Sequence, residues 1–79
     1  MPAAEASTIE QVAAIYRRVL DTDAVQAESD FFDLGGDSLL ATRVISAIAR
    51  DLGPELTITD FLKSPTPRSV AELIASLTA

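Results

Sequence analysis

The sequence predicts an all-α fold, a small four-helix bundle with three long helices and one short third helix. Apolar residues recur at helical spacing in three segments, and no segment shows the apolar-polar alternation of a half-buried strand. The 79-residue chain is 48% hydrophobic but has only three Phe and one Tyr as aromatic residues. The core must therefore consist mainly of Leu, Ile, Val and Ala, a composition that favours helices.

The first helix is expected over about residues 8–20. Ser7 and Glu10 have the spacing of a capping box, in which each side chain satisfies a free amide of the first turn. Residues 1–7 are small or polar and show no apolar period, so we expect a flexible N-terminus there and a single domain over residues 8–79. The apolar stripe of this helix comprises Ile9, Val12, Ala13, Tyr16, Val19 and Leu20.

A long connection is expected over residues 21–37. It is mostly polar but carries an apolar insert with Phe31, Phe32 and Leu34. Loops of this length are uncommon in compact domains and are usually functional or disordered. The embedded aromatic residues favour a packed, functional loop.

The second helix is expected over residues 38–52, ended by Gly53 and Pro54. Glycine supplies a left-handed stop there, and proline prevents the helix from continuing. Thr57 and Asp60 form a cap-like pair that opens a short third helix, which carries Ile58, Phe61 and Leu62.

The last helix is expected to begin after Ser64 and Pro65, with Thr66 as its N-cap and Pro67 as its first residue. The missing amide of proline costs nothing at that position. The apolar stripe of this helix comprises Val70, Leu73, Ile74 and Leu77.

Composition excludes several classes of function. The chain has no cysteine and no histidine, so it has no disulfide and no catalytic triad based on either residue. Its net charge of −6 argues against nucleic acid as a partner. The apolar runs are too short to span a membrane, and the N-terminus does not resemble a signal peptide. A soluble cytoplasmic protein is expected.

Two familiar ion-binding motifs do not fit the sequence. The acidic residues after Asp21 resemble a calcium loop only superficially, because Val25 and Gln26 occupy the positions where an EF-hand needs an oxygen ligand and then glycine. Gly35 and Gly36 lack the Lys-Ser/Thr ending of a phosphate-binding loop. No metal site is therefore expected.

The densest concentration of functional signals is the string from Asp30 to Leu40. Gly35 and Gly36 give the backbone freedom and leave nothing beside them to crowd a partner. Asp37 and Ser38 then open the second helix, where free amides and the positive end of the helix dipole favour an anion such as a phosphodiester. From these two residues alone, the favoured interpretation is that Asp37 and Ser38 only cap a helix, since Asp and Ser are leading cap residues.

The longer string resembles the phosphopantetheine attachment signature of carrier proteins. In that family, Asp-Ser-Leu opens the second helix, as at residues 37–39, and the run at residues 31–36 resembles that of peptidyl carrier proteins of nonribosomal peptide synthetases. The resemblance covers residues 9–77 and implies an acyl-carrier-protein-like bundle. It also implies a 4'-phosphopantetheine cofactor, taken from coenzyme A and attached to Ser38, with Asp37, Gly36 and Gly35 beside it.

The class of carrier depends on two further features. Many peptidyl carriers have histidine before the serine, whereas aspartate, as at Asp37, is usual in acyl carriers of fatty-acid and polyketide synthesis and also occurs in some peptidyl carriers. Asp37 alone therefore does not distinguish the two classes. The outer face of the second helix, together with Gly35 and Gly36, favours the peptidyl class, because this face has arginines and no acidic residue, unlike the acidic helix typical of fatty-acid carriers. This face contains Leu39, Thr42, Arg43, Ser46 and Arg50.

The resemblance implies a carrier without catalytic residues of its own, which holds an amino- or aryl-acyl group as a thioester. Its partners would be a phosphopantetheinyl transferase, an adenylating enzyme, and condensation, tailoring or thioesterase enzymes. We expect a monomer that docks these enzymes through Leu39, Arg43 and Phe61. A polyketide or fatty-acid carrier and a non-carrier interaction bundle are the alternatives. The cargo, and whether the carrier is discrete or part of a synthetase, are left open.

Overall fold

Four helices form in the computed structural model, which describes residues 2–63 and 65–78. These residues contain no strand, which confirms the predicted all-α class. The helices are α1 (Pro2–Leu20), α2 (Ser38–Asp51), α3 (Ile58–Lys63) and α4 (Pro67–Thr78). The predicted bundle of three long helices and one short third helix is therefore confirmed.

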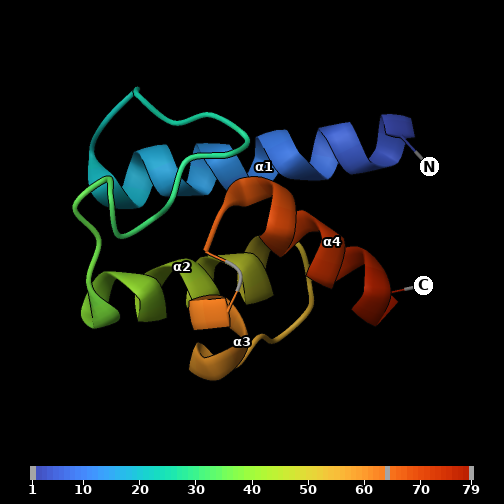
Figure 1. The fold of residues 1–79 in the computed structure, drawn as a ribbon. Coiled ribbons are helices and arrows are strands. Elements are labelled where there is room, and N and C mark those ends of the chain that lie inside the picture. The colour runs from blue at the N-terminus through green and yellow to red at the C-terminus, as the bar shows by residue number, and fades with distance from the viewer. Residues whose placement is uncertain (1, 64, 79) are drawn as a thin grey trace.

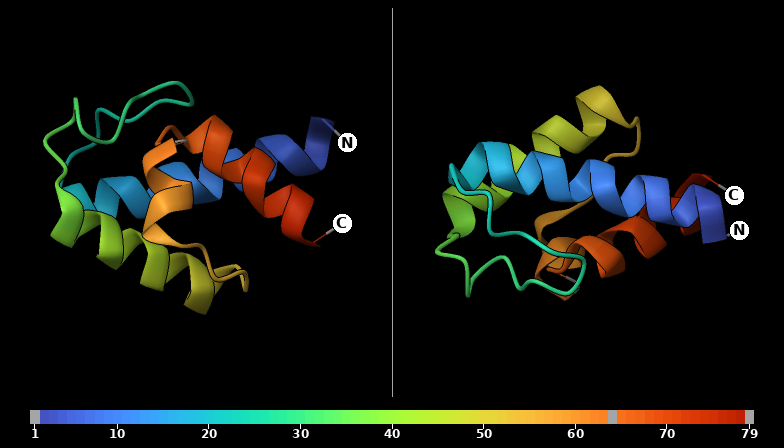
Figure 2. Two further views of the ribbon diagram at one scale, coloured as in Figure 1. Left: turned by 60° about the horizontal axis from the view of Figure 1, so that its bottom comes forward. Right: turned by 90° about the horizontal axis from the view of Figure 1, so that it is seen from above.

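The long first helix organises the bundle. It packs against both α2 and α4, while α3 packs against α2. Figure 1 shows α1 along the top with the other helices beneath it, and both ends of the chain at the same end of the molecule. In Figure 2, α3 lies between α2 and α4. The connection over residues 21–37 lies beside α1 and returns to the start of α2.

The start of α1 differs from the prediction. The helix begins at Pro2, six residues before the expected start at Thr8. Proline is pre-organised for the first helical position, and Ala3, Ala4 and Glu5 are strong helix formers. Ser7 therefore lies inside the helix, and the expected capping box does not open it. The flexibility of residues 1–7 stays a prediction.

An aromatic cluster lies at the centre of the core. Tyr16 from α1, Phe31 from the long loop and Phe61 from α3 are all fully buried. Phe31 makes edge-to-face contacts with Tyr16 and Phe61, with ring centroids 5.0 and 5.1 Å apart, an arrangement that aromatic pairs prefer. The smaller buried residues of the helices surround this cluster: Val12, Ala13, Ile15, Ala41, Val44, Ala47, Ile48, Val70, Ala71 and Ile74.

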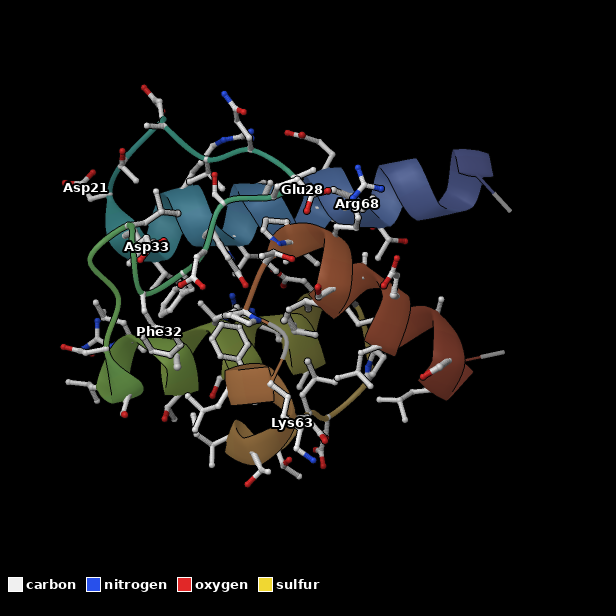
Figure 3. The ribbon with its side chains drawn as sticks, in the orientation of Figure 1. Asp21, Glu28, Phe32, Asp33, Lys63 and Arg68 are labelled. Carbon is white, nitrogen blue, oxygen red and sulfur yellow. The ribbon has the colours of Figure 1, made fainter. Side chains whose placement is uncertain are left out.

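The long loop is fixed to the start of α4. The carbonyl of Pro65 accepts hydrogen bonds from the Tyr16 hydroxyl and from the Phe31 amide, and burial raises the pKa of Tyr16, so its phenol stays protonated. Arg68 donates its backbone amide to Ala27, at 3.0 Å, and its guanidinium to Glu28. Figure 3 shows the side chains of Glu28 and Arg68 side by side. The loop is thus packed, as predicted.

The ends of the last three helices follow their local signals. Gly53 has a positive φ of 107°, as expected for a left-handed stop after α2. The Thr57 hydroxyl accepts the Asp60 amide at 3.0 Å, and the Thr66 hydroxyl accepts the Ser69 amide at 3.1 Å. The predicted caps of α3 and α4 are confirmed.

The apolar stripe of α4 is shorter than predicted, and this yields a stability test. Ile74 is 6% exposed, whereas Leu77 is 53% exposed, because Leu77 lies in the last turn, beyond the bundle core. Ile74→Ala is expected to lower the free energy of unfolding by about 2–5 kcal/mol. The matched variant Leu77→Ala should change it by less than about 0.5 kcal/mol.

Chemical denaturation of both variants measures this difference. Equal destabilisation by the two substitutions would show that the end of α4 packs as tightly as its middle.

Candidate functional site

The first turn of α2 presents Ser38 to solvent. Asp37 is the N-cap, with extended backbone, and its Oδ1 accepts the Leu40 amide at 2.9 Å. Ser38 is the first residue of the helix and is exposed. Within the described part of the chain, no hydrogen-bond partner occupies its Oγ. Asp37 alone therefore caps the helix, and the hydroxyl of Ser38 has no structural task.

Two glycines precede this turn and have different roles. Gly35 has a φ of 102° and nothing within 4 Å of the place where a Cβ would lie. Glycine is therefore favoured here because it adopts this positive φ without strain, not because space is short. At Gly36 a Cβ would lie 2.2 Å from Cε2 of Phe31, far inside van der Waals contact. Gly36 is therefore needed for the close approach of the aromatic ring to the backbone.

A compact turn holds the ring of Phe31 in this position. One carboxylate oxygen of Asp30 accepts the amides of Phe32 and Asp33, at 2.8 and 3.2 Å, and the Gly36 amide donates to the Phe31 carbonyl at 3.0 Å. Because Phe31 also contacts Tyr16 and Phe61, the aromatic core directly supports the backbone two residues before Ser38.

The site can accommodate a phosphodiester on Ser38. The amides of Ser38 and Leu39 cannot have an acceptor within the helix, and the first turn of α2 contains no acidic residue. Free amides and the positive end of the helix dipole stabilise a negative charge there. With Gly35 and Gly36 beside it, the exposed hydroxyl is also accessible to an enzyme. The residues present fit a covalently attached phosphate group.

The outer face of α2 is exposed as predicted. Leu39 is 65% exposed, the largest value among the exposed large hydrophobic residues. Thr42, Arg43, Ser46 and Arg50 are exposed as well. An apolar side chain next to Ser38, with a cation one turn further along the helix, is suited to contact with a protein partner.

Phe61 does not belong to this surface, and the prediction that it docks partners is wrong. Its side chain is fully buried, because α3 turns this residue toward Tyr16 and Phe31. The exposed apolar residues of α3 are Ile58, 39% exposed, and Leu62, 50% exposed. The apolar pattern of so short a helix does not reveal which of its faces is buried.

Sequence reasoning missed two contributions to the site region. The contact between Phe31 and Gly36 has only one local signal, an aromatic residue five positions before a glycine. Arg18 of α1 lines the same shallow groove as Leu39 and Arg43, and no local signal predicts this, because it depends on how α1 crosses α2.

No group of three acidic, histidine or cysteine side chains that could hold a metal ion gathers in residues 2–63 and 65–78. None of the helices described is both long and apolar enough to cross a membrane.

A protein-family model identifies the region that contains this site. The family described as phosphopantetheine attachment site matches residues 10–74, which include all of α2 and α3 and most of α1 and α4. The predicted cofactor, 4'-phosphopantetheine, is therefore confirmed for the family of this chain, and a non-carrier interaction bundle is excluded.

Relatives at the sequence level include nonribosomal peptide synthetases and subunits of large peptide synthases. Surfactin synthase subunit 1 of Bacillus subtilis (strain 168) is 39% identical over 69 residues, which are 87% of this chain and 2% of that protein. A linear gramicidin synthase protein of Brevibacillus parabrevis is 39% identical over 70 residues, 89% of this chain and 1% of that protein. The chain thus spans a very small part of these large relatives.

A solved structure of comparable size identifies the type of carrier. A nonribosomal peptidyl carrier domain is 35% identical, with a TM-score of 0.74 and 84% of each chain covered. A peptidyl carrier protein solved together with the phosphopantetheine transferase Sfp and coenzyme A is 28% identical, with a TM-score of 0.84, over 87% of this chain and 90% of that one. The chain belongs to the phosphopantetheine attachment family, as a peptidyl carrier domain of the nonribosomal peptide synthetase type.

Proposed function

We propose that the Oγ of Ser38 carries the 4'-phosphopantetheine arm and that the domain delivers an amino- or aryl-acyl group to partner enzymes. The observation that carries this assignment is the exposed hydroxyl of Ser38 at the first position of α2, left without a structural task because Asp37 caps the helix. When attached, the arm supplies the thiol on which the acyl group is held as a thioester.

The residues around Ser38 have distinct tasks in this function. Asp37 orders the first turn of α2, so that the amides of Ser38 and Leu39 face the place where the phosphodiester charge would lie. Gly36 allows the ring of Phe31 to support this turn from below. Gly35 leaves the approach to the hydroxyl open.

The chain lacks histidine and cysteine, and in this function the chemistry is carried out by partner enzymes. A phosphopantetheinyl transferase attaches the arm, an adenylating enzyme loads it, and condensation, tailoring or thioesterase enzymes take over the acyl group. The solved complex of a related peptidyl carrier protein with a transferase and coenzyme A supports the first of these partners. A cytoplasmic, monomeric carrier completes the proposal.

A two-stage loading experiment tests this function. The protein is first incubated with a promiscuous transferase and coenzyme A, and its mass is measured. The arm-bearing form is then offered to adenylating enzymes with ATP and amino or aryl acids, or to an acyltransferase with malonyl-coenzyme A. We expect loading by an adenylating enzyme; loading by the acyltransferase alone would indicate a polyketide carrier instead.

Leu39→Ala is expected to slow arm attachment without unfolding the bundle. Leu39 is 65% exposed, and burying such a side chain in a partner contributes about 1.5–3 kcal/mol, or roughly a tenfold to hundredfold change in affinity. The kcat/KM of the transferase for the carrier should fall accordingly, while the melting temperature stays within a few degrees of the parent value.

Leu62→Ala provides the matched control, because Leu62 is an exposed leucine on α3 rather than on α2. A larger effect of this control on attachment would move the docking surface to α3. Unfolding of the Leu39→Ala protein would show that Leu39 is part of the core.

A further inference from the structure

A shallow groove runs along the outer face of α2, where the end of α1 crosses it. Its volume is about 290 Å³. Val19 and Ala47 contribute apolar atoms to it, and Leu39 lies at the end nearest Ser38. The lining residues of α2 extend from Leu39 to Arg50, a distance of roughly 16 Å at 1.5 Å per residue. The lining of the groove therefore covers about three turns of α2, so that a partner helix would lie over it rather than inside it.

The charge of this groove is opposite to that of the whole chain. Arg18, Arg43 and Arg50 line it, and no acidic residue does, although the chain has only six basic residues and a net charge of −6. Half of the cations of the chain are thus concentrated on one side of the molecule.

Among the residues that the structure describes, one acidic residue is the shared partner of two of these arginines. Asp51 pairs with both Arg18 and Arg50, at 3.2 and 3.1 Å, and hydrogen bonds from Arg50 and Arg18 lower the pKa of its carboxyl group. Arg43, in the middle of the groove, has no ion-pair partner among residues 2–63 and 65–78. The groove therefore keeps an excess of positive charge.

We propose that this groove docks an acidic amphipathic helix of a partner enzyme. An apolar ridge of that helix would cover Leu39, Val19 and Ala47, and its flanking carboxylates would pair with the arginines at the rim. The charge of the groove favours an acidic helix over a basic one. A basic helix would be repelled by the three guanidinium groups, whereas the carboxylates of an acidic helix would be attracted to them. The inference rests on the proposed function, since a carrier of acyl groups must dock with several enzymes.

Synthetic helical peptides test this proposal. The probe is an end-blocked peptide with leucine along one face and glutamate on both flanks; its counterpart has every glutamate replaced by lysine. Binding to the ¹⁵N-labelled protein is followed by amide chemical shifts at low ionic strength. We expect the glutamate peptide to shift the amides of residues 18–19 and 39–50 and to bind at least about tenfold more tightly than the lysine peptide. Added salt should weaken this binding.

Two charge-reversal variants distinguish the effect of the groove from the effect of the net charge. Arg43→Glu and Lys63→Glu change the net charge equally, but Lys63 lies exposed on α3 (Figure 3) and does not line the groove. Arg43→Glu should weaken binding of the glutamate peptide by about tenfold or more, whereas Lys63→Glu should leave it close to the parent value.

Four results would overturn the docking proposal: equal binding to Arg43→Glu and the parent, preference for the lysine peptide, no binding at millimolar peptide, or shifts confined to Ile58 and Leu62 on α3. Preference for the lysine peptide is an informative outcome, because the net charge of −6 attracts a basic peptide to the protein as a whole. Only the local charge of the groove favours the glutamate peptide. Arm attachment is measured on the same proteins. A parent that accepts the arm but not the peptide refutes only the docking proposal, whereas a parent that accepts no arm refutes the proposed function.

Discussion

Ser38→Ala is expected to abolish arm attachment and to leave the bundle folded. The side chain removed has no task in capping α2, because Asp37 accepts the Leu40 amide. Alanine is also the best helix former. The free energy of unfolding should therefore change by less than about 0.5 kcal/mol, while incubation with a transferase and coenzyme A produces no gain in mass.

Ser76→Ala is the matched control, since Ser76 is another exposed serine on a helix, but on α4 and away from the outer face of α2. It should gain the arm like the parent protein. If Ser38→Ala still gained the mass of the arm, the attachment site would have to lie elsewhere. If it unfolded, Ser38 would have a structural role that its exposed position does not indicate.

Gly36→Ala is expected to damage both stability and arm attachment. A Cβ at this position would lie 2.2 Å from the ring of Phe31, and the ring cannot retreat easily, because it is fully buried between Tyr16 and Phe61. Overpacking of this kind typically costs about 1–3 kcal/mol. Since the displaced backbone leads directly into α2, the kcat/KM of arm attachment should fall by more than the loss of folded protein explains.

Two further variants separate strain at the site from general destabilisation. Gly53→Ala also strains the backbone, because φ at this position is 107°, but the strain lies at the opposite end of α2. This variant should lower the free energy of unfolding by about 1–2 kcal/mol. The rate of arm attachment to its folded fraction should stay unchanged. Phe31→Leu combined with Gly36→Ala removes the ring edge that the new methyl group meets and should restore part of the attachment rate. If the kcat/KM of arm attachment fell only in proportion to the loss of folded protein in both Gly36→Ala and Gly53→Ala, Gly36 would have no role in positioning the site.

Local signals predicted the last three helices well. Gly53 stops α2 through its own backbone conformation, and hydroxyl caps at Thr57 and Thr66 open α3 and α4. Each of these signals acts over three or four residues, so it can be recognised in the sequence. Asp37 and Ser38 were placed at the start of α2 for the same reason, although only the structure shows that Asp37 does the capping.

The features that were not predicted depend on propensity summed over several residues or on tertiary packing. At the N-terminus, Pro2 and the alanines after it outweigh the cap signal of Ser7, so α1 begins earlier than expected. The burial of Phe61 depends on its contacts with α1 and the long loop, which the apolar pattern of α3 does not specify. Arg18 joins the groove on α2 only because the two helices cross.

The most direct test of the carrier assignment is to locate the arm on the unaltered protein. After incubation with a transferase and coenzyme A, the protein is digested and the modified peptide is fragmented in a mass spectrometer. We expect a single modification, at Ser38. A modification on another hydroxyl, such as Ser29, Thr42 or Ser46, or an unmodified protein under conditions that load a known carrier, would contradict the assignment.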